Sequence, residues 1–89
     1  MTNTATVLAI PLDEPPLGLS WARLERAGAA LWRVRSAADG RSIGHLRVVK
    51  ADGAVRYRAE RFHAACGALI AFGEFWTADE AVDVLRRSV

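Results

Sequence analysis

The chain has 89 residues, of which 52% are hydrophobic and 25% are charged, and its net charge is +2. This composition indicates one small globular domain and excludes a disordered chain. No apolar stretch approaches the roughly 18 residues that a membrane-spanning helix needs, and the N-terminus lacks the basic start of a signal peptide. The single cysteine, Cys66, excludes an internal disulfide. Together these features predict a cytoplasmic protein with no membrane partner.

The first 18 residues predict an extended, proline-containing arm. Pro11, Pro15 and Pro16 remove backbone donors and disfavour helix. Residues 6–10 are apolar enough to form a short edge strand. The expected organisation is therefore an arm over residues 1–18, followed by a single α+β domain over residues 19–89.

Residues 19–30 leave two alternatives open. Trp21, Leu24 and Gly28 recur at helical spacing, and Ser20 is a suitable N-cap. Arg23 in the first turn of such a helix would oppose the helix dipole, however. A strand that turns near Gly28 fits equally well, and it is the alternative we favour.

The middle of the chain predicts an antiparallel β-meander. Apolar and polar residues alternate there in three segments, a pattern typical of strands with one buried face. The turns Asp39-Gly40 and Asp52-Gly53 join these segments, because both residue types tolerate positive φ. Gly44 interrupts the alternation in the second segment and predicts a β-bulge. The segments are residues 31–36, 43–50 and 55–62.

The C-terminal residues 77–88 predict an amphipathic helix. Thr77 and Glu80 form a capping box, in which each side chain bonds the other residue's backbone amide. Asp83 and Arg87 can pair at i, i+4 on the outer side. The apolar stripe consists of Ala78, Ala81, Val82, Leu85 and Val89.

We expect this stripe to pack on the apolar face of the meander, in an α+β fold. Residues 68–75 form either a fourth strand or an irregular approach to the helix, which gives three to four strands, with extra N-terminal strands as an alternative. Trp76 is expected in the core, as aromatic residues usually are in so small a domain. The sheet residues expected beneath the helix are Trp32, Val34, Leu46, Val48, Val55 and Tyr57.

Nothing in the sequence predicts an enzyme, a cofactor, a metal site or a small-molecule substrate. His63 and Cys66 would bring an imidazole near a thiol if their segment were helical, but no third group orients them. His45, His63 and Cys66 are scattered and do not make a metal-binding motif.

Positive charge is concentrated between residues 33 and 63. This segment holds eight basic and three acidic residues, a net charge of +5, whereas the remainder of the chain carries −3. The strand alternation predicts that the basic side chains and His45 share the polar face of the meander. Such a face can contact phosphates or guanine edges. The candidate nucleic-acid or polyanion-binding residues are Arg33, Arg35, Arg47, Arg56 and Arg58.

The end of the predicted sheet and the start of the helix carry a family resemblance. The junction residues are Gly73, Phe75, Thr77, Glu80 and Ala81. With three preceding strands, this junction resembles the arm-type DNA-binding domains of phage and transposon integrases, which are similar to the plant AP2-type fold. The resemblance covers residues 31–88 and implies that the sheet enters the DNA major groove. The chain departs from that family in its N-terminal extension and in lacking an attached catalytic domain. It also resembles small stand-alone proteins of GC-rich bacteria, a resemblance that implies no activity.

Two functions follow as hypotheses. The first is a small non-enzymatic protein-interaction module, of which a homodimer is one form, because small domains often need a partner for stability. The alternative is an accessory nucleic-acid-binding protein that uses the basic sheet face.

Overall fold

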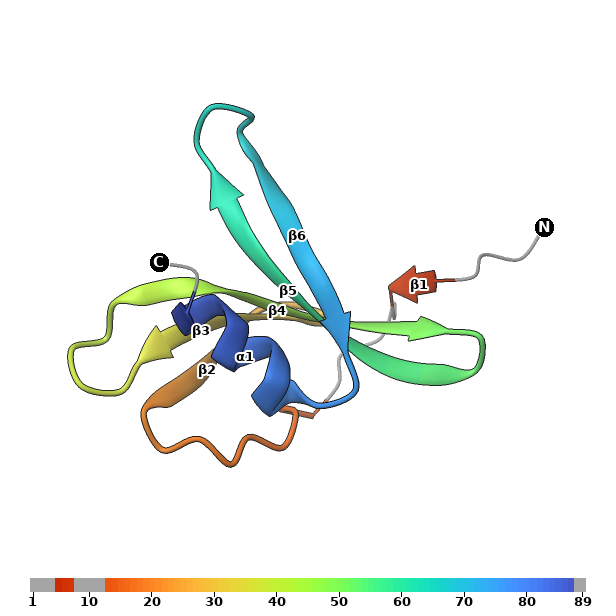
Figure 1. The fold of residues 1–89 in the computed structure, drawn as a ribbon, viewed down its shortest axis with the longest axis horizontal. Coiled ribbons are helices and arrows are strands. Elements are labelled where there is room, and N and C mark those ends of the chain that lie inside the picture. The colour runs from red at the N-terminus through yellow and green to blue at the C-terminus, as the bar shows by residue number, and fades with distance from the viewer. Residues whose placement is uncertain (1–4, 8–12, 88–89) are drawn as a thin grey trace.

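A computed structural model describes residues 5–7 and 13–87. Within these residues the protein is an α+β fold in which an antiparallel sheet carries one helix on one of its faces (Figure 1). The elements in chain order are β1 (Ala5–Val7), β2 (Ala22–Gly28), β3 (Leu31–Ser36), β4 (Ser42–Ala51), β5 (Ala54–His63), β6 (Ala68–Phe75) and α1 (Ala78–Arg87).

The sheet is a meander with the strand order β2-β3-β4-β5-β6, and β1 pairs with β4 off this path. The expected count of three to four strands is therefore too low, whereas the alternative with extra N-terminal strands is confirmed by β1 and β2. Both undecided segments are strands: β2 places Ala22 and Leu24 against the core, and β6 pairs with β5 along its length. The helical alternative for residues 19–30 is therefore wrong, because this segment pairs with β3 and buries its apolar side chains as a strand of the sheet. Of the predicted edge strand, residues 8–10 lie outside the described part of the chain.

The turns and the bulge are confirmed. Gly40 has φ of 73°, and Asp52 and Gly53 have φ of 52° and 79°, so both hairpin turns use the left-handed region. The register between β3 and β4 shifts where Gly44 pairs with Val34. Gly44 has φ of 155°, a conformation that L side chains rarely adopt.

The core lies between α1 and one face of the sheet, as predicted for most of its residues; Val89 of the predicted stripe lies outside the described part of the chain. Two expectations were wrong. Val55 is 43% exposed, because it pairs with Lys50 next to the β4–β5 turn, at the start of β5. Trp76 is 61% exposed and stacks on the guanidinium of Arg56 instead of entering the core. The buried contact set comprises Ala22, Ala30, Trp32, Val34, Leu46, Val48, Ala59, Ala78, Ala81, Val82 and Leu85.

Both ends of α1 are capped. The Glu80 amide donates to Thr77 Oγ1 at 3.2 Å, and the Thr77 amide donates to Glu80 Oε1 at 3.2 Å, which confirms the capping box. Arg87 pairs with Asp83 at 3.0 Å, also as predicted. At the other end, the guanidinium of Arg61 on β5 donates to the Leu85 carbonyl oxygen at 2.6 Å. A cation at this position suits the negative end of the helix dipole and ties α1 to the sheet.

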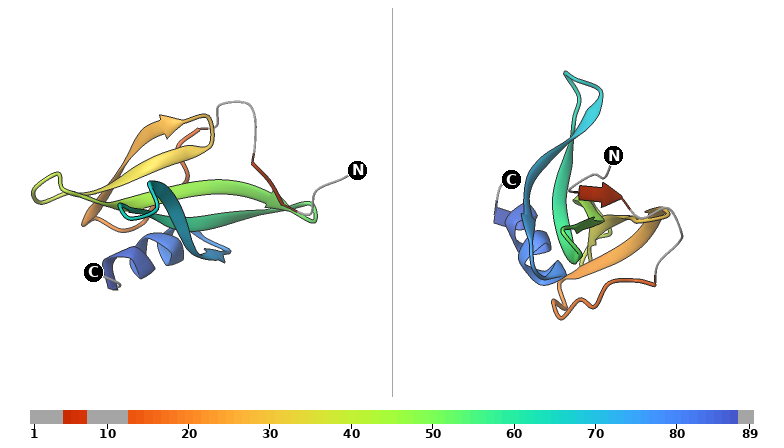
Figure 2. Two further views of the ribbon diagram at one scale, coloured as in Figure 1. Left: turned by 90° about the horizontal axis from the view of Figure 1, so that it is seen from above. Right: turned by 90° about the vertical axis from the view of Figure 1, so that its right-hand side faces the viewer.

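The strands do not lie in one plane. The outer part of β5 and β6 rises away from the other strands as a separate hairpin, while α1 lies against the lower part of the sheet (Figures 1 and 2). Pairing between β4 and β5 ends at His45 and Glu60. Beyond that point β5 pairs with β6 alone, and a bulge in β6 between Ala71 and Gly73 accompanies the change of direction.

The contact of α1 with Gly44 gives the first prediction. A Cβ at Gly44 would stand 2.7 Å from Leu85 Cδ2 and 3.0 Å from the Glu60 carbonyl oxygen. We expect Gly44→Ala to lower the free energy of unfolding by about 2–4 kcal/mol, because it adds backbone strain to overpacking. Gly40→Ala is the matched control: its φ is also positive, but no atom lies within 4 Å. It should cost only about 1–2 kcal/mol. Urea denaturation measures both, and equal losses would contradict the prediction.

Candidate functional site

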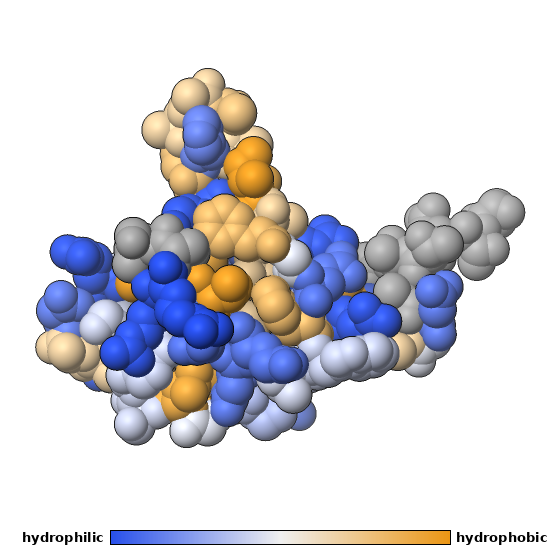
Figure 3. All heavy atoms as spheres, in the orientation of Figure 1, coloured by the Kyte–Doolittle hydropathy of each residue, from blue (hydrophilic) through white to orange (hydrophobic). Residues whose placement is uncertain are grey.

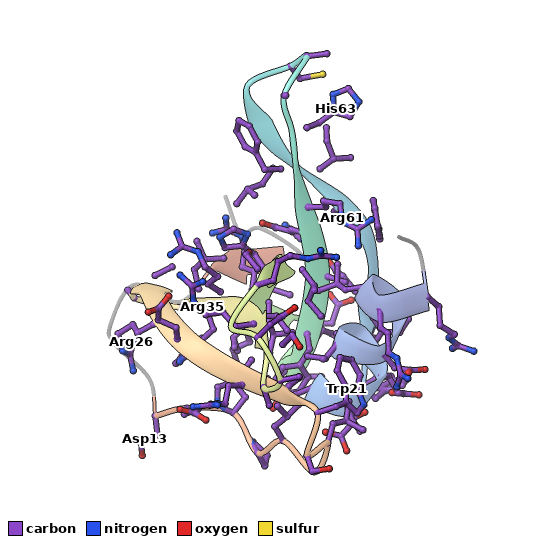
Figure 4. All side chains as sticks on the ribbon, turned by 90° about the vertical axis from the view of Figure 1, so that its left-hand side faces the viewer. Asp13, Trp21, Arg26, Arg35, Arg61 and His63 are labelled. Carbon is purple, nitrogen blue, oxygen red and sulfur yellow. The ribbon has the colours of Figure 1, made fainter. Side chains whose placement is uncertain are left out.

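The sheet face opposite α1 carries the arginines singled out from the sequence. The register pairs Arg33 with His45 and Arg47 with Arg58, and Arg35 follows two residues after Arg33 on β3. Figure 4 shows Arg35 on the side of the sheet away from the helix. We call this surface the arginine face; its residues are Arg33, Arg35, His45, Arg47, Arg56 and Arg58.

Glutamates on the neighbouring strands share this face. Glu25 of β2 accepts hydrogen bonds from Arg35 at 2.9 Å and from Arg33 at 3.2 Å. The hydrogen bond and charge of Arg35, together with those of Arg33, hold the pKa of the Glu25 carboxyl below its ordinary value, so this group is ionised at neutral pH. Arg35 also donates to the Gly40 carbonyl oxygen at 2.7 Å.

A second set of ion pairs lies at the centre of the face. Glu60 of β5 is buried, with its side chain 6% exposed, and its Oε2 accepts from Arg47 Nε at 2.8 Å. Arg58 lies 3.9 Å from the same oxygen and bonds Glu74 of β6 at 2.5 Å. Four of the five candidate arginines are thus bound to carboxylates. The charge excess between residues 33 and 63 did not indicate this neutralisation, because Glu25 and Glu74 lie outside that segment.

The fifth candidate, Arg56, has a different partner. Its guanidinium lies 3.8 Å from the centre of the Trp76 ring, a cation–π contact at the surface. Its Nε is buried with no hydrogen-bond partner among the described residues. The pair combines a cation with a mostly exposed aromatic ring, which suits stacking on a flat ligand.

His45 adds no positive charge to the face at neutral pH. Burial lowers its pKa below the ordinary value of 6.5, and the nearby charges of Arg33 and Arg47 lower it further. The carboxylate of Glu60, which lies opposite on β5, acts in the other direction and only partly offsets these effects. The imidazole is therefore neutral at pH 7.

The outer β5–β6 hairpin is the second candidate surface. We call residues 61–73 the β5–β6 arm. Beyond Glu60 this hairpin has no contact with β4 through strand pairing, and three of its large apolar side chains face solvent: Phe62 is 57% exposed, Ile70 is 40% exposed and Phe72 is 41% exposed. Figure 3 shows apolar colour over most of the projecting arm. The apolar run over residues 68–75 was the sequence signal for this surface; it predicted a strand or an irregular approach to the helix, and not the exposure of Ile70 and Phe72.

The two edge strands of the meander differ in charge. β2 carries Arg23, Glu25 and Arg26 within seven residues. β6 carries Glu74 as its single charged residue, and that carboxylate is bound to Arg58 on the neighbouring strand. Charged side chains are one means by which natural proteins prevent edge strands from pairing with other chains. The outer edge of β6 between residues 68 and 73 lacks this protection.

The histidine and thiol considered for catalysis lie at the tip of the arm. The Cys66 amide donates to the His63 carbonyl oxygen at 3.1 Å in the turn, and both side chains are exposed. Figure 4 shows His63 at the far end of the hairpin. Among the described residues no group of three His, Cys, Asp or Glu side chains is placed to hold a metal ion. In the same part of the chain no helix is long and apolar enough to cross a membrane.

Comparison with protein-family models, with curated proteins and with solved structures gives no match to this chain. The resemblance to integrase arm-type domains stays a prediction that these comparisons do not test.

The buried position of Glu60 gives the second prediction. Glu60→Gln should lower the free energy of unfolding by roughly 2–3 kcal/mol, because it leaves Arg47 and Arg58 half-buried beside an uncharged group. Glu25→Gln removes the same charge from an exposed position and should cost much less. Urea denaturation at low and high salt compares the two variants. Equal losses would show that burial does not strengthen the central ion pair.

Proposed function

We propose that the protein is a small non-enzymatic protein-interaction module whose binding element is the β5–β6 arm. The observation that carries this proposal is the exposure of Phe62, Ile70 and Phe72 on a hairpin that stands clear of the core. Large apolar side chains clustered on a projection are typical of surfaces that a partner covers. The single cysteine, which allows no internal disulfide, supports a reducing cytoplasm as the place of action.

The arm has enough apolar surface to matter energetically. Complete burial of one Phe or Ile side chain contributes about 1.5–3 kcal/mol. The three exposed side chains lie on both sides of the hairpin, since Phe62 pairs with Leu69 while Ile70 pairs with Arg61. A partner that covers only one side would leave part of this surface in water. A partner that extends the sheet would cover both sides.

The third prediction tests the arm directly. Phe62→Thr combined with Ile70→Thr should abolish protein binding, whether the bound chain is a second copy or a different protein, while the fold is retained. Threonine keeps the strand propensity and removes most of the apolar area. Val55→Thr is the matched control, because Val55 is exposed to a degree similar to Ile70 but lies at the opposite end of β5 from Phe62.

Sedimentation velocity of the pure protein and affinity capture, each performed on all three proteins, supply the measurements. Circular dichroism checks that the double variant is folded. A double variant that binds as well as the wild type would overturn the proposal. So would a wild-type protein that binds nothing in either assay.

A nucleic-acid-binding role is the second candidate, and the Arg56–Trp76 pair favours it. An exposed ring beside a guanidinium is suited to stacking on bases, and further arginines lie on the same face. Glu25, Glu60 and Glu74 weigh against this role, because a phosphate would have to compete with carboxylates already bound. For that reason we place it after the interaction module.

The fourth prediction separates the two roles. If the second candidate holds, labelled DNA should bind at low salt and be released steeply as salt rises, because phosphate contacts displace counterions. Trp76→Ala with Arg56→Glu should then abolish binding. Arg87→Gln is the control, since it removes an exposed positive charge from α1 instead of from the sheet. Fluorescence anisotropy measures the affinities, and no binding at low salt would exclude the role.

A further inference from the structure

We infer that the partner of the β5–β6 arm is a second copy of this chain, joined by antiparallel pairing of β6 with β6 across a two-fold axis at Ile70. The inference rests on the proposed function and gives it a partner and a geometry. Two copies would form one continuous sheet, with the free edge of each β6 covered by the other.

The order of side chains on β6 supports self-pairing. In an antiparallel pair centred on Ile70, Leu69 stands opposite Ala71 and Ala68 stands opposite Phe72, in both directions. Each large side chain therefore faces a small one, except at the axis, where the two Ile70 side chains meet. This alternation of large and small groups allows close packing on both faces of the new strand pair.

The charges are also compatible with two identical copies. A two-fold interface brings each residue near its own counterpart, so any charge near the axis is repelled by itself. Residues 64–73 contain no charged side chain. The charge nearest to the axis is Arg61, which pairs with Ile70 from the inner strand and whose guanidinium donates to the Leu85 carbonyl oxygen and lies 5.1 Å from the centre of the Phe72 ring. Glu74 lies beyond the paired segment and is bound to Arg58, and the bulge between Ala71 and Gly73 ends the regular strand at that point. The paired segment is therefore residues 68–72.

The shape of the molecule permits this contact. The arm projects from the remaining strands, and α1 lies at its base, so the outer edge of β6 is reached without displacing the helix (Figures 1 and 2). On one side of the new pair, Ile70 and Phe72 of each copy would adjoin. On the other side, Leu69 would adjoin Phe62 of its own chain, to which it is already paired. Five residues per copy make a small interface, so a weak dimer that dissociates on dilution is expected.

Cross-linking at the axis tests the inference. In a protein carrying Cys66→Ser, Ile70→Cys should form a disulfide-linked dimer under mild oxidation, because directly opposite residues of antiparallel strands have Cβ atoms about 4.5–5.5 Å apart. Ala68→Cys in the same background is the control. Its two copies would lie four residues apart along the strand, about 13 Å, and should not cross-link. Amide hydrogen exchange at residues 69–71 should slow as protein concentration rises, and sedimentation velocity should show a monomer–dimer equilibrium.

The outcomes separate this inference from the proposed function. A dimer that cross-links at Ile70 and not at Ala68 supports both. A dimer that is lost in the Phe62→Thr, Ile70→Thr variant but does not cross-link through Cys at position 70 or 68 contradicts the two-fold pairing at Ile70. The β5–β6 arm would then still be the binding element. If the protein is a monomer that captures another protein through the β5–β6 arm, the inference of a second copy is wrong, while the proposed function stands. A monomer with no arm-dependent binding overturns both.

Discussion

The packing of Leu85 on Gly44 is the contact on which the arrangement of the other elements depends. A glycine at this point of β4 lets the last turn of α1 approach the sheet backbone, where even a methyl group would collide with Leu85. On the same turn, the Leu85 carbonyl oxygen accepts a hydrogen bond from Arg61 of β5. Helix, β4 and β5 therefore meet at one place. Since α1 is fixed there, it covers one face of the sheet and leaves the opposite face to the arginines.

On the arginine face, the net charge of a sequence segment differs from the net charge of the surface to which that segment contributes. The excess of +5 over residues 33–63 belongs to three consecutive strands and the turns between them, but the sheet extends to β2 and β6 on either side. Those outer strands contribute Glu25 and Glu74, each within hydrogen-bond distance of an arginine. The face is a network of ion pairs with a cation–π pair beside it. Such a network orients side chains well and offers few uncommitted charges to a polyanion.

Local signals allowed much of the fold to be predicted. The capping box at Thr77, the turns at Asp39-Gly40 and Asp52-Gly53 and the bulge at Gly44 depend on neighbouring residues, so the sequence displays them directly. The wrong predictions concern contacts between residues that are far apart in the sequence. Trp76 looked like a core residue because nothing in its neighbourhood shows that it stacks on Arg56, twenty positions earlier. The β5–β6 arm was also not predicted. Alternating residues indicate that residues 55–62 form a strand, but they do not show that β5 stops pairing with β4 at Glu60.

The contrast between the two edges of the sheet explains why the arm is the better candidate for function. A small domain has little apolar surface to spare, since its core is thin and its stability modest. Exposed apolar side chains on an uncharged edge strand expose a monomer to uncontrolled aggregation. At β2 charged residues guard against this aggregation, whereas β6 carries Ile70 and Phe72 on an edge that no other described strand pairs with. Neither side chain contributes to the buried core cluster, so stability of the single chain does not account for them. If a partner covers β6, both features are explained: residues 68–73 need no charged side chains to prevent pairing, and the apolar side chains Ile70 and Phe72 are buried in the complex.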